Sequence, residues 1–295
     1  MRDDTAPQTV GVVVTNYETW DLTRRCLDRV AAHGAGVSDV LVVDDASASP
    51  VPADLKARIR VNPHNLGLVR SLNLGIREVA GDVIVLFDSD AHPLTDFATP
   101  ALRRFATDPR LGILGFATVD GAGRPTGSSE PEPGVASLVL GQRLHARVAR
   151  WLPQGPLCVF TCAMAVRRTT FAELGGFDED FDWLDLDLDL SIRARRAGWT
   201  VAAAPEIVAF HRGSGAPQAT SQRVVRFHKT RWLLLRKAGT IRRPRLVRAL
   251  VLTRLRLEIL ILRLAGAFHA RSPEELADKL AGRRAALRWG AEHYR

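Results

Sequence analysis

Residues 81–90 read GDVIVLFDSD, and the fold of the chain is decided by this stretch. Residues 82–87, DVIVLF, are predicted to form a strand, and its apolar run at 83–87 is followed by two aspartates, Asp88 and Asp90. An uninterrupted apolar run of this length is typical of a strand that is buried on both faces of a parallel sheet. Two carboxylates at this spacing, where a strand turns into a loop, can both reach one hard cation such as Mg²⁺ or Mn²⁺.

The same pattern, an apolar strand that ends in polar residues, occurs twice before this stretch. Residues 10–15 read VGVVVT and residues 40–43 read VLVV. Because apolar residues at helical spacing separate these strands, they predict βαβ units and a mostly parallel, Rossmann-like central sheet flanked by helices. Ligands of open α/β sheets bind at the carboxyl ends of the strands. Polar side chains gather at these ends: Thr15 and Tyr17, Asp44 and Asp45, and Asp88 and Asp90.

Apolar periodicity predicts the remaining elements. Strands are expected at 58–61, 111–116, 157–167, 201–204 and 207–211, and helices at 21–32, 65–79 and 102–105. After about Ser221 the chain is expected to be wholly helical. The chain therefore divides into an α/β domain, 1–220, and a basic helical C-terminal extension, 221–295.

Charge is distributed unevenly between these two parts. The whole chain has 41 Lys/Arg and 32 Asp/Glu, a formal net charge of +9. Residues 221–295 hold 19 basic and 5 acidic residues, or +14, which leaves −5 for residues 1–220. A protein that coats nucleic acid would carry positive charge on its main body as well. Nucleic acid is therefore not expected as a partner.

The number of cysteines and the hydropathy of the chain indicate where in the cell the protein is expected. The three cysteines, Cys26, Cys158 and Cys162, are too few for a disulfide framework and form no CxxC pair. The polar N-terminus, Met1–Gln8, does not resemble a signal peptide, and no apolar run is long enough to cross a bilayer. We expect a cytoplasmic protein, either free or peripheral on the inner face of the membrane.

Several motifs follow one another in a characteristic order. They are VVVTNY at 12–17, VVDDAS at 42–47, NLG at 65–67, GDVIVLFDSD at 81–90, GGFDE at 175–179, DLDL at 187–190, and then His211. Their order and spacing resemble the family 2 glycosyltransferases, in particular bacterial rhamnosyltransferase-like members.

The resemblance implies the GT-A fold and a metal-dependent, inverting, hexosyltransferase-like enzyme. Its donor would be a nucleoside-diphosphate sugar. Its acceptor would be a hydroxyl group on a cell-surface glycan, a lipid-linked molecule or a small natural product. Residues 1–117 would form the nucleotide-sugar-binding half of the catalytic domain, and residues 118–220 its acceptor and catalytic half.

The same resemblance implies roles for individual residues. Asp88, Asp90 and His211 would hold a divalent metal, Mn²⁺ or Mg²⁺, which neutralises charge on the leaving diphosphate. Arg70 replaces the small residue that the family often has there, and it could reach a phosphate. The sequence leaves the nucleotide base of the donor open among uridine, thymidine and guanosine. The residues implied in nucleotide-sugar binding are Thr15, Tyr17, Asp44, Asp45, Asn65, Arg70, Asp88 and Ser89.

Inverting transfer needs a base that takes the proton of the acceptor hydroxyl. The family carries it in the motif Glu-Asp-x-Asp-Leu, and the matching stretch here is LDLDL at 186–190, with Leu186 in place of the glutamate. Asp187 matches the family base, and Asp185 is an alternative that lies out of register. Asp189 is expected to cap or orient the helix that follows.

Two other function classes are open on the residues alone. A sugar nucleotidyltransferase would need a glycine-rich, basic phosphate loop after its first strand, and residues 15–19, TNYET, do not provide one. A non-catalytic GT-A-like binding module is the second. The acidic residues of the expected site argue against it.

The basic extension has its own alternatives. Residues 245–266 read RLVRALVLTRLRLEILILRLAG, which predicts a helix too charged to span a bilayer. Its arginines gather mainly on one side, so it could lie on an anionic membrane surface. Packing on the catalytic domain or in a homodimer is the other interpretation.

Overall fold

The computed structural model describes residues 8–151, 155–212, 220–267 and 272–294. Contacts divide the chain into two compact units. Unit 1 consists of Met1–Glu130 and Leu157–Gly213, and unit 2 of Pro131–Pro156 and Ser214–Arg295.

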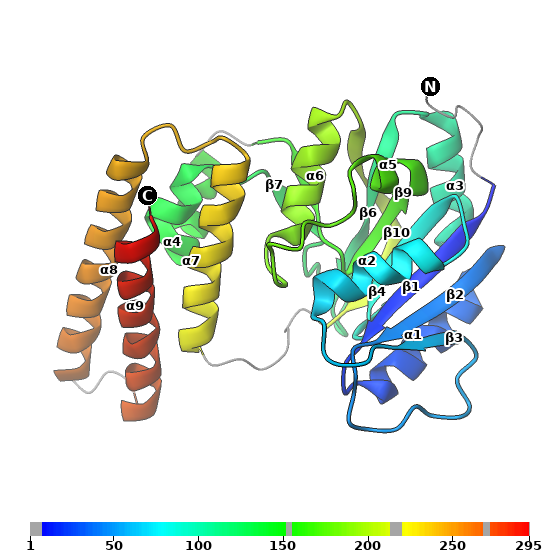
Figure 1. The fold of residues 1–295 in the computed structure, drawn as a ribbon, viewed down its shortest axis with the longest axis horizontal. Helices are drawn as coiled ribbons and strands as arrows, with labels where there is room; N and C mark the ends of the chain where they lie inside the picture. Colours follow the sequence, from blue (N-terminus) through cyan, green and yellow to red (C-terminus); the bar gives the residue numbers. More distant parts are fainter. Residues whose placement is uncertain (1–7, 152–154, 213–219, 268–271, 295) are drawn as a thin grey trace. The chain divides into compact units, whose positions relative to one another are not determined.

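Unit 1 is built around one large sheet (Figure 1). Its strands are β1 (Val10–Asn16), β2 (Val37–Asp44), β3 (Arg58–Val61), β4 (Val83–Asp88), β5 (Ala91–Pro93), β6 (Leu111–Val119), β9 (Ala163–Arg167) and β10 (Thr200–His211). Among the described residues the strand order is β3-β2-β1-β4-β9-β6-β10-β5. β9 runs antiparallel between β4 and β6, and β5 pairs antiparallel with β10, while the other pairs are parallel. The predicted mostly parallel α/β sheet is confirmed.

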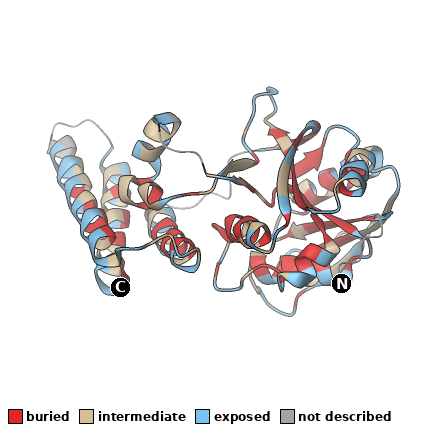
Figure 2. Cartoon of the chain, turned by 90° about the horizontal axis from the view of Figure 1, so that it is seen from above, coloured by how far each residue is buried: buried red, intermediate tan, exposed pale blue. Residues whose placement is uncertain are grey.

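Helices cover both faces of this sheet. They are α1 (Trp20–His33), α2 (Leu68–Glu78), α3 (Ala98–Thr107), α5 (Arg168–Glu173) and α6 (Leu186–Arg196). Residues of α1 and α3 join one buried cluster with Val10, Val12 and Val14 of β1. α2 lies on the opposite face, where Gly75 approaches the side chain of Val13. Figure 2 shows the buried residues concentrated on the strands and on the inward sides of the helices.

The prediction of a single strand over 157–167 is wrong. The structure has two strands there, β8 (Leu157–Val159) and β9, separated by residues 160–162. β8 pairs with β7 (Ser129–Pro131) in a separate two-stranded sheet, and the N–H of Phe160 donates to the carbonyl of Ser128 at 2.8 Å. An apolar run cannot show such a break, because most residues of the two strands and of the turn between them are buried.

The two short strands predicted at 201–204 and 207–211 are one strand, β10. Pro205 lies at a shift in the pairing with β6: Ala204 lies beside Phe116, and Val208 already beside Ala117. Proline cannot donate to a strand ladder, so the sequence signal of a break is real. The bulge absorbs the extra residues, and the strand continues to His211.

The loop between α5 and α6 is tied to α2 by Asn73. The Nδ2 of Asn73 donates to the carbonyl of Phe177 at 2.9 Å, and its Oδ1 accepts the Phe177 N–H at 2.8 Å. Gly176 has φ +88°, and a Cβ there would lie 2.7 Å from the Oδ1 of Asn73. Glycine is therefore required both by the backbone and by the close approach.

The regular secondary structure of unit 2 among its described residues is helical, apart from the end of β7. Its helices are α4 (Val135–Val148), the 3₁₀ turn η1 (Ala149–Trp151), α7 (Thr220–Lys237), α8 (Pro244–Ala267) and α9 (Pro273–His293). The helical nature of the C-terminal extension is confirmed for these residues. No helix among them is both long and apolar enough to cross a membrane.

Residues 131–156 group with the C-terminal helices, although the sequence predicts 118–220 as one half of the catalytic domain. The reason is the packing of α4. Leu138 is fully buried in a cluster with Val251 and Leu255 of α8 and Tyr294 after α9. The partition of the chain therefore follows the buried clusters and not the order of the sequence.

We expect Asn73→Ala to destabilise unit 1 by about 2–4 kcal/mol, because it leaves a buried N–H and a buried carbonyl of Phe177 without partners. Thermal unfolding of the full chain measures this. Arg70→Ala on the same helix is the control: its ion pair with Glu179 is exposed, and its loss should change stability by less than about 0.5 kcal/mol. Equal unfolding temperatures for the two variants would contradict the role given to Asn73.

Candidate active site

The carboxyl ends of three parallel strands meet at one edge of the sheet. In the strand register Thr15 of β1 lies beside Asp88 of β4, and Asn16 lies beside Asp44 of β2. Thr15 and Asp88 are half-buried, so both can be reached from solvent. The polar strand ends predicted from the sequence are thus neighbours in space.

A cluster of possible metal ligands lies at the end of β4. His211, the last residue of β10, pairs with Ala91 of β5, and this pairing brings its ring next to Asp90. The Nε2 of His211 lies 3.8 Å from the Oδ1 of Asp90. One ligand atom each from Asp88, Asp90 and His211 lie within 4.8 Å of one another. The structure therefore brings together all three residues predicted as metal ligands.

The electrostatics of this cluster fit a divalent cation. Burial, and then the charge of Asp90, raise the pKa of Asp88 to about 6, while His211 opposes the shift. The buried Nδ1 of His211 has no hydrogen-bond partner among the described residues. Two carboxylates that repel each other beside an imidazole form a donor set that Mn²⁺ or Mg²⁺ would stabilise.

Asp187 lies in the first turn of α6. Its Oδ2 accepts the N–H of Thr161 at 3.3 Å, and its Oδ1 accepts the N–H of Leu188 at 2.9 Å. Burial raises the pKa of Asp187 to about 7, and the charge of Asp185 adds to the shift, while these two hydrogen bonds oppose it. A carboxylate with a pKa near neutrality is suited to take up a proton.

The sequence alternative, Asp185, occupies a different position. It precedes α6 with φ +64°, in the left-handed region, and its carbonyl accepts the N–H of Asp189 at 3.0 Å. Asp185 is buried, whereas Asp187 is half-buried. Of the two carboxylates, Asp187 is thus the more accessible to an acceptor hydroxyl.

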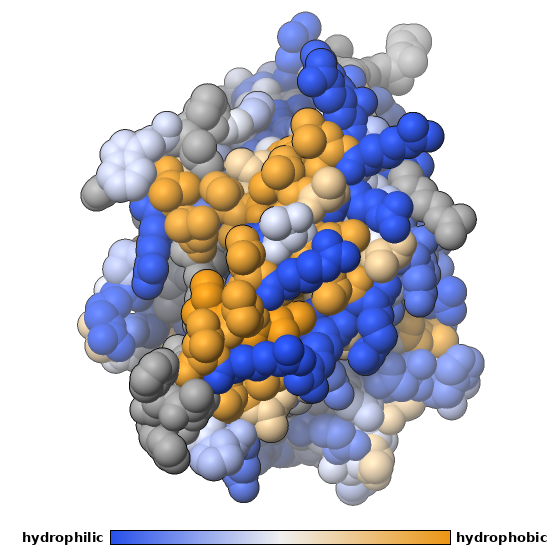
Figure 3. Space-filling view, turned by 90° about the vertical axis from the view of Figure 1, so that its left-hand side faces the viewer, coloured by the Kyte–Doolittle hydropathy of each residue, from blue (hydrophilic) through white to orange (hydrophobic). Residues whose placement is uncertain are grey.

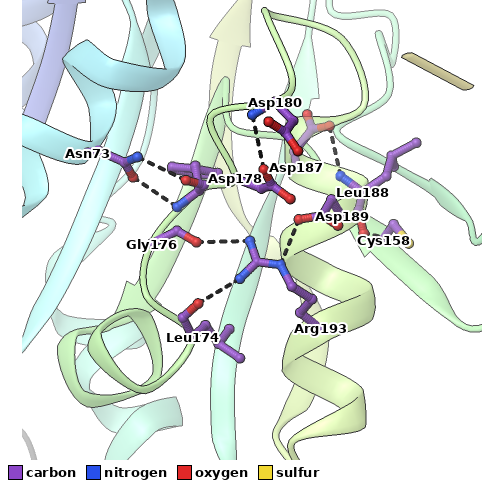
Figure 4. Close-up of polar contacts among 11 residues, drawn as sticks. Asn73, Cys158, Leu174, Gly176, Asp178, Asp180, Asp187, Leu188, Asp189 and Arg193 are labelled. Carbon is purple, nitrogen blue, oxygen red and sulfur yellow. Dashed lines mark hydrogen bonds and ion pairs between the residues drawn. The ribbon is translucent and has the colours of Figure 1, made fainter. Parts of the chain in front are cut away.

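Asp189 and Arg193 fix the start of α6 to the loop that follows α5 (Figure 4). The Nε of Arg193 donates to the Oδ2 of Asp189 at 2.6 Å. Its two terminal nitrogens donate to the carbonyls of Leu174 and Gly176 at 2.9 and 2.8 Å. One guanidinium therefore connects the helix that carries Asp187 to the glycine turn.

The turn before β9 lies between the candidate metal ligands and Asp187, because Ala163 pairs with Phe87, next to Asp88, and the Thr161 N–H donates to Asp187. Burial raises the pKa of the Cys162 thiol, and the charges of Asp88, Asp187 and Asp90 add to the effect. Three carboxylates from β4, from the turn after it and from α6 thus act on one buried sulfur. The predicted metal ligands and the predicted base belong to one region of unit 1.

Asp44 and Asp45 are held by protein donors. Asp44 accepts the Nδ2 of Asn16 and the hydroxyl of Ser47, both at 2.6 Å, and also the Ser47 N–H at 3.0 Å. Asp45 accepts the Nδ2 of Asn62 at 2.9 Å and the N–H groups of the NLG loop, at 2.7 Å from Leu66 and 2.8 Å from Gly67. Both aspartates therefore brace loops at the edge of the sheet.

The other predicted nucleotide-site residues line the same edge to different degrees. Ser89 is linked to the first loop, because the hydroxyl of Thr19 lies 2.9 Å from its own. Tyr17 is 53% exposed. Asn65 and Arg70 are exposed, and the Nε of Arg70 donates to Glu179 at 3.0 Å.

Sequence reasoning missed two residues that shape the site. Asn16 is buried, and its amide oxygen accepts the hydroxyls of Thr19 and Thr23 at 3.0 and 2.7 Å. Thr161 holds Asp187 through its backbone N–H. Asn16 could have been found as a polar residue at the end of an apolar strand, but a backbone donor such as Thr161 leaves no signal in the sequence.

Comparison with known sequences agrees with this arrangement. The family model for glycosyl transferase family 2 matches residues 11–175, more than half of the chain. The N-acetylglucosaminyl-diphospho-decaprenol L-rhamnosyltransferase of Mycobacterium tuberculosis is 24% identical over 269 aligned residues, covering 79% of this chain and 86% of that protein. An inactive polypeptide N-acetylgalactosaminyltransferase-like protein 5 of Macaca fascicularis is 28% identical over 159 residues, covering 48% of this chain and 34% of that protein.

Solved structures show the same fold. The mannosyltransferase PcManGT of Pyrobaculum calidifontis, in complex with GDP-Man and Mn²⁺, has a TM-score of 0.58 at 18% identity and covers 99% of this chain and 89% of its own. The glucosyl-3-phosphoglycerate synthase of Mycobacterium tuberculosis, with Mn²⁺ and UDP-glucose, has a TM-score of 0.52 at 18% identity and covers 81% and 82%. This chain belongs to glycosyl transferase family 2 and is a glycosyltransferase with the GT-A fold.

Proposed function

We propose that this chain moves a sugar from a nucleoside-diphosphate sugar to a hydroxyl acceptor, with inversion at the anomeric carbon and with a divalent metal. Unit 1 is assigned the catalysis, and unit 2 an accessory role. The observation that carries the proposal is the cluster of Asp88, Asp90 and His211, whose ligand atoms lie within 4.8 Å of one another in the same region as Asp187.

Asp88, Asp90 and His211 are assigned as the residues that hold the metal. When bound, a Mn²⁺ or Mg²⁺ ion supplies positive charge that stabilises the diphosphate leaving group. Asp88 is also assigned a contact to the donor, because it ends β4 beside Thr15, and Ser89 follows it. The DXD sequence formed by Asp88 and Asp90 is thus given the metal-binding role.

Asp187 is assigned as the base that takes the proton from the acceptor hydroxyl. Two backbone N–H groups orient its carboxylate, and both of its oxygens keep lone pairs beyond these bonds. The raised pKa of Asp187, about 7, means that its carboxylate binds a proton more readily than an exposed aspartate does. Asp185 is assigned an electrostatic role, since its charge contributes to this shift.

The nucleotide is assigned to the edge formed by Thr15, Tyr17, Asp44 and Asp45. In each aspartate one carboxylate oxygen accepts a single hydrogen bond among the described residues, so an acceptor position is left for a base N–H. Asn65 and Arg70 border this edge from the start of α2, where a guanidinium could meet a donor phosphate.

We assign the acceptor to the lipid-linked class. The support is the relative named a rhamnosyltransferase of a diphospho-decaprenol acceptor, which is matched over most of both chains. A cytoplasmic location is proposed with it, because Cys26, Cys158 and Cys162 are buried thiols outside any disulfide.

The alternative function is that of a non-catalytic binding module, and one of the similar proteins is named as inactive. The site of this chain argues against it. Asp88, Asp90 and His211 lie together, Asp187 is present, and the pKa of Asp187 is raised toward neutrality. A carboxylate with such a pKa is typical of catalytic sites.

We expect Asp187→Asn to lower kcat by roughly 10²–10⁴-fold, the usual contribution of a general base, while donor affinity stays nearly unchanged. Transfer assays and calorimetric titration with the donor measure the two effects. Asp21→Asn, whose side chain is fully exposed on α1, is the control and should keep full activity. The fold should survive, because burial already disfavours the charge of Asp187, as its raised pKa shows. Near-normal turnover in Asp187→Asn would show that another residue is the base.

The pH profile should report the same carboxylate. Because the base must be ionised and the pKa of Asp187 is about 7, log kcat/KM should fall with unit slope below about pH 7. Asp185 raises that pKa, so Asp185→Asn should move the acid limb to lower pH while keeping activity at higher pH. An inactive Asp185→Asn enzyme would instead identify Asp185 as the base.

Removal of divalent metal with a chelator should abolish transfer, and Mn²⁺ or Mg²⁺ should restore it. Electron paramagnetic resonance can follow Mn²⁺ binding directly. His211→Ala should weaken it by at least about tenfold, because one of three ligands is lost. His64→Ala, on an exposed loop, is the control. Full activity in the chelator would refute the metal dependence.

A further inference from the structure

One helix of unit 2 carries a disproportionate share of the exposed apolar side chains. Among the described residues twelve large apolar side chains are exposed, and six of them belong to α8. Each of the six is between 46% and 63% exposed. They are Leu246, Leu250, Leu257, Leu260, Ile261 and Leu264. Contiguous apolar surface of this kind marks an interaction site.

These six side chains lie on a single face of α8, called here the outer face. At 100° per residue they fall within an arc of about 100°. The opposite side of the helix, with Val247, Val251 and Leu255, is buried in the core of unit 2. Figure 3 looks onto this side of unit 2 and shows the apolar side chains as a band, with hydrophilic side chains beside and across it. The fold of unit 2 thus uses only one of the two apolar sides of α8.

Basic side chains border the outer face along one flank. Arg245, Arg256 and Arg263 lie within about 20° of one another on the helical wheel. All three are exposed, and none forms an ion pair with a described residue. Within α8 the one acidic residue is Glu258, which accepts hydrogen bonds from Arg254 and, at 3.2 Å, from Arg283 of α9. The charge beside the outer face is therefore positive and uncompensated.

We propose that the outer face of α8 docks on an anionic lipid bilayer. The helix would lie in the plane of the surface, with its leucines and Ile261 at the boundary between headgroups and acyl chains. The flanking arginines would then meet the lipid phosphates, where each basic group raises the partition coefficient roughly fivefold. This docking goes beyond the proposed function, because it depends neither on Asp187 nor on a metal.

A second copy of the chain is a poorer occupant of this face. An antiparallel contact between two α8 helices related by twofold symmetry sets the arginine flank of one copy against the same flank of the other. A parallel contact sets it against the flank of Arg254 and Glu258, whose carboxylate is already paired. Neither arrangement neutralises the arginines, whereas anionic headgroups do.

Flotation of the full chain with phosphatidylcholine vesicles, with and without phosphatidylglycerol, tests the docking. We expect binding to the anionic vesicles at low ionic strength and release at high salt, because salt screens the arginines. The triple variant Leu257→Gln, Leu260→Gln, Ile261→Gln should bind at least tenfold more weakly. These side chains are exposed, so the fold should be preserved, which circular dichroism can check.

The arginine flank is tested separately. The triple variant Arg245→Gln, Arg256→Gln, Arg263→Gln should weaken binding to anionic vesicles by about 100-fold, since each arginine contributes roughly fivefold. Val61→Gln, at a position 52% exposed in unit 1, and Arg103→Gln, also exposed in unit 1, are the matched controls and should bind normally.

Three results would overturn the proposal. One is that the unaltered chain does not bind anionic vesicles at low salt. Another is that the leucine and isoleucine variant binds as well as the unaltered chain, which would mean attraction by charge alone. The third is a dimer in sedimentation velocity that this variant dissociates while vesicles are not bound, which would assign the face to a second copy.

A fluorescent label can report the depth of the outer face. The three native cysteines are buried, so an environment-sensitive thiol dye should react mainly with Leu257→Cys. Its emission should shift to the blue on anionic vesicles, because the label enters an apolar environment. The same dye on Val61→Cys should not respond. Equal shifts at the two positions would contradict docking through α8.

Discussion

The parallel register of β1 with β2 and β4 is the constraint on which the site depends. It sets Thr15 beside Asp88 and Asn16 beside Asp44. A slip of one residue would turn every side chain of a strand to the other face and remove these neighbours from the edge. The valines of β1 are fully buried on both faces, Val12 and Val14 toward α1 and α3 and Val13 toward α2, so such a slip would disrupt the packing against the helices on each side. Apolar packing thus holds in place carboxylates that would otherwise repel one another.

The aspartates around this edge are of two kinds. Asp44, Asp45 and Asp189 have their oxygens engaged by nearby amides, hydroxyls and a guanidinium, and they shape loops and helix starts. For Asp88 and Asp187 the desolvation of the carboxylate outweighs the interactions that favour its charge, and the pKa of each is raised. A group whose charge is left uncompensated by its surroundings is poised to bind a cation or a proton. The division separates residues that build the site from those assigned to its chemistry.

Features that depend on one local segment could be predicted from the sequence, whereas features that depend on contacts between distant segments could not. The ends of β1, β2 and β4 could be placed, because each apolar run marks its own strand. His211 was reached only through the family resemblance, since its approach to Asp90 depends on the antiparallel pairing of β5 with β10. The turn before β9 and the packing of Leu138 against α8 were missed for the same reason: both rest on contacts between segments far apart in the chain.

Net charge, like the strand patterns, does not reveal contacts between distant residues. The +14 of the C-terminal residues combines two populations of arginine that composition cannot tell apart. Arg254 and Arg283 turn toward Glu258 and neutralise it within the helical unit. Arg245, Arg256 and Arg263 stay exposed along the flank of an apolar face. Arginines needed only for solubility would interrupt that face. Arginines that stem from its border keep the apolar residues together on one arc of the helix, which is the arrangement that an interfacial helix requires.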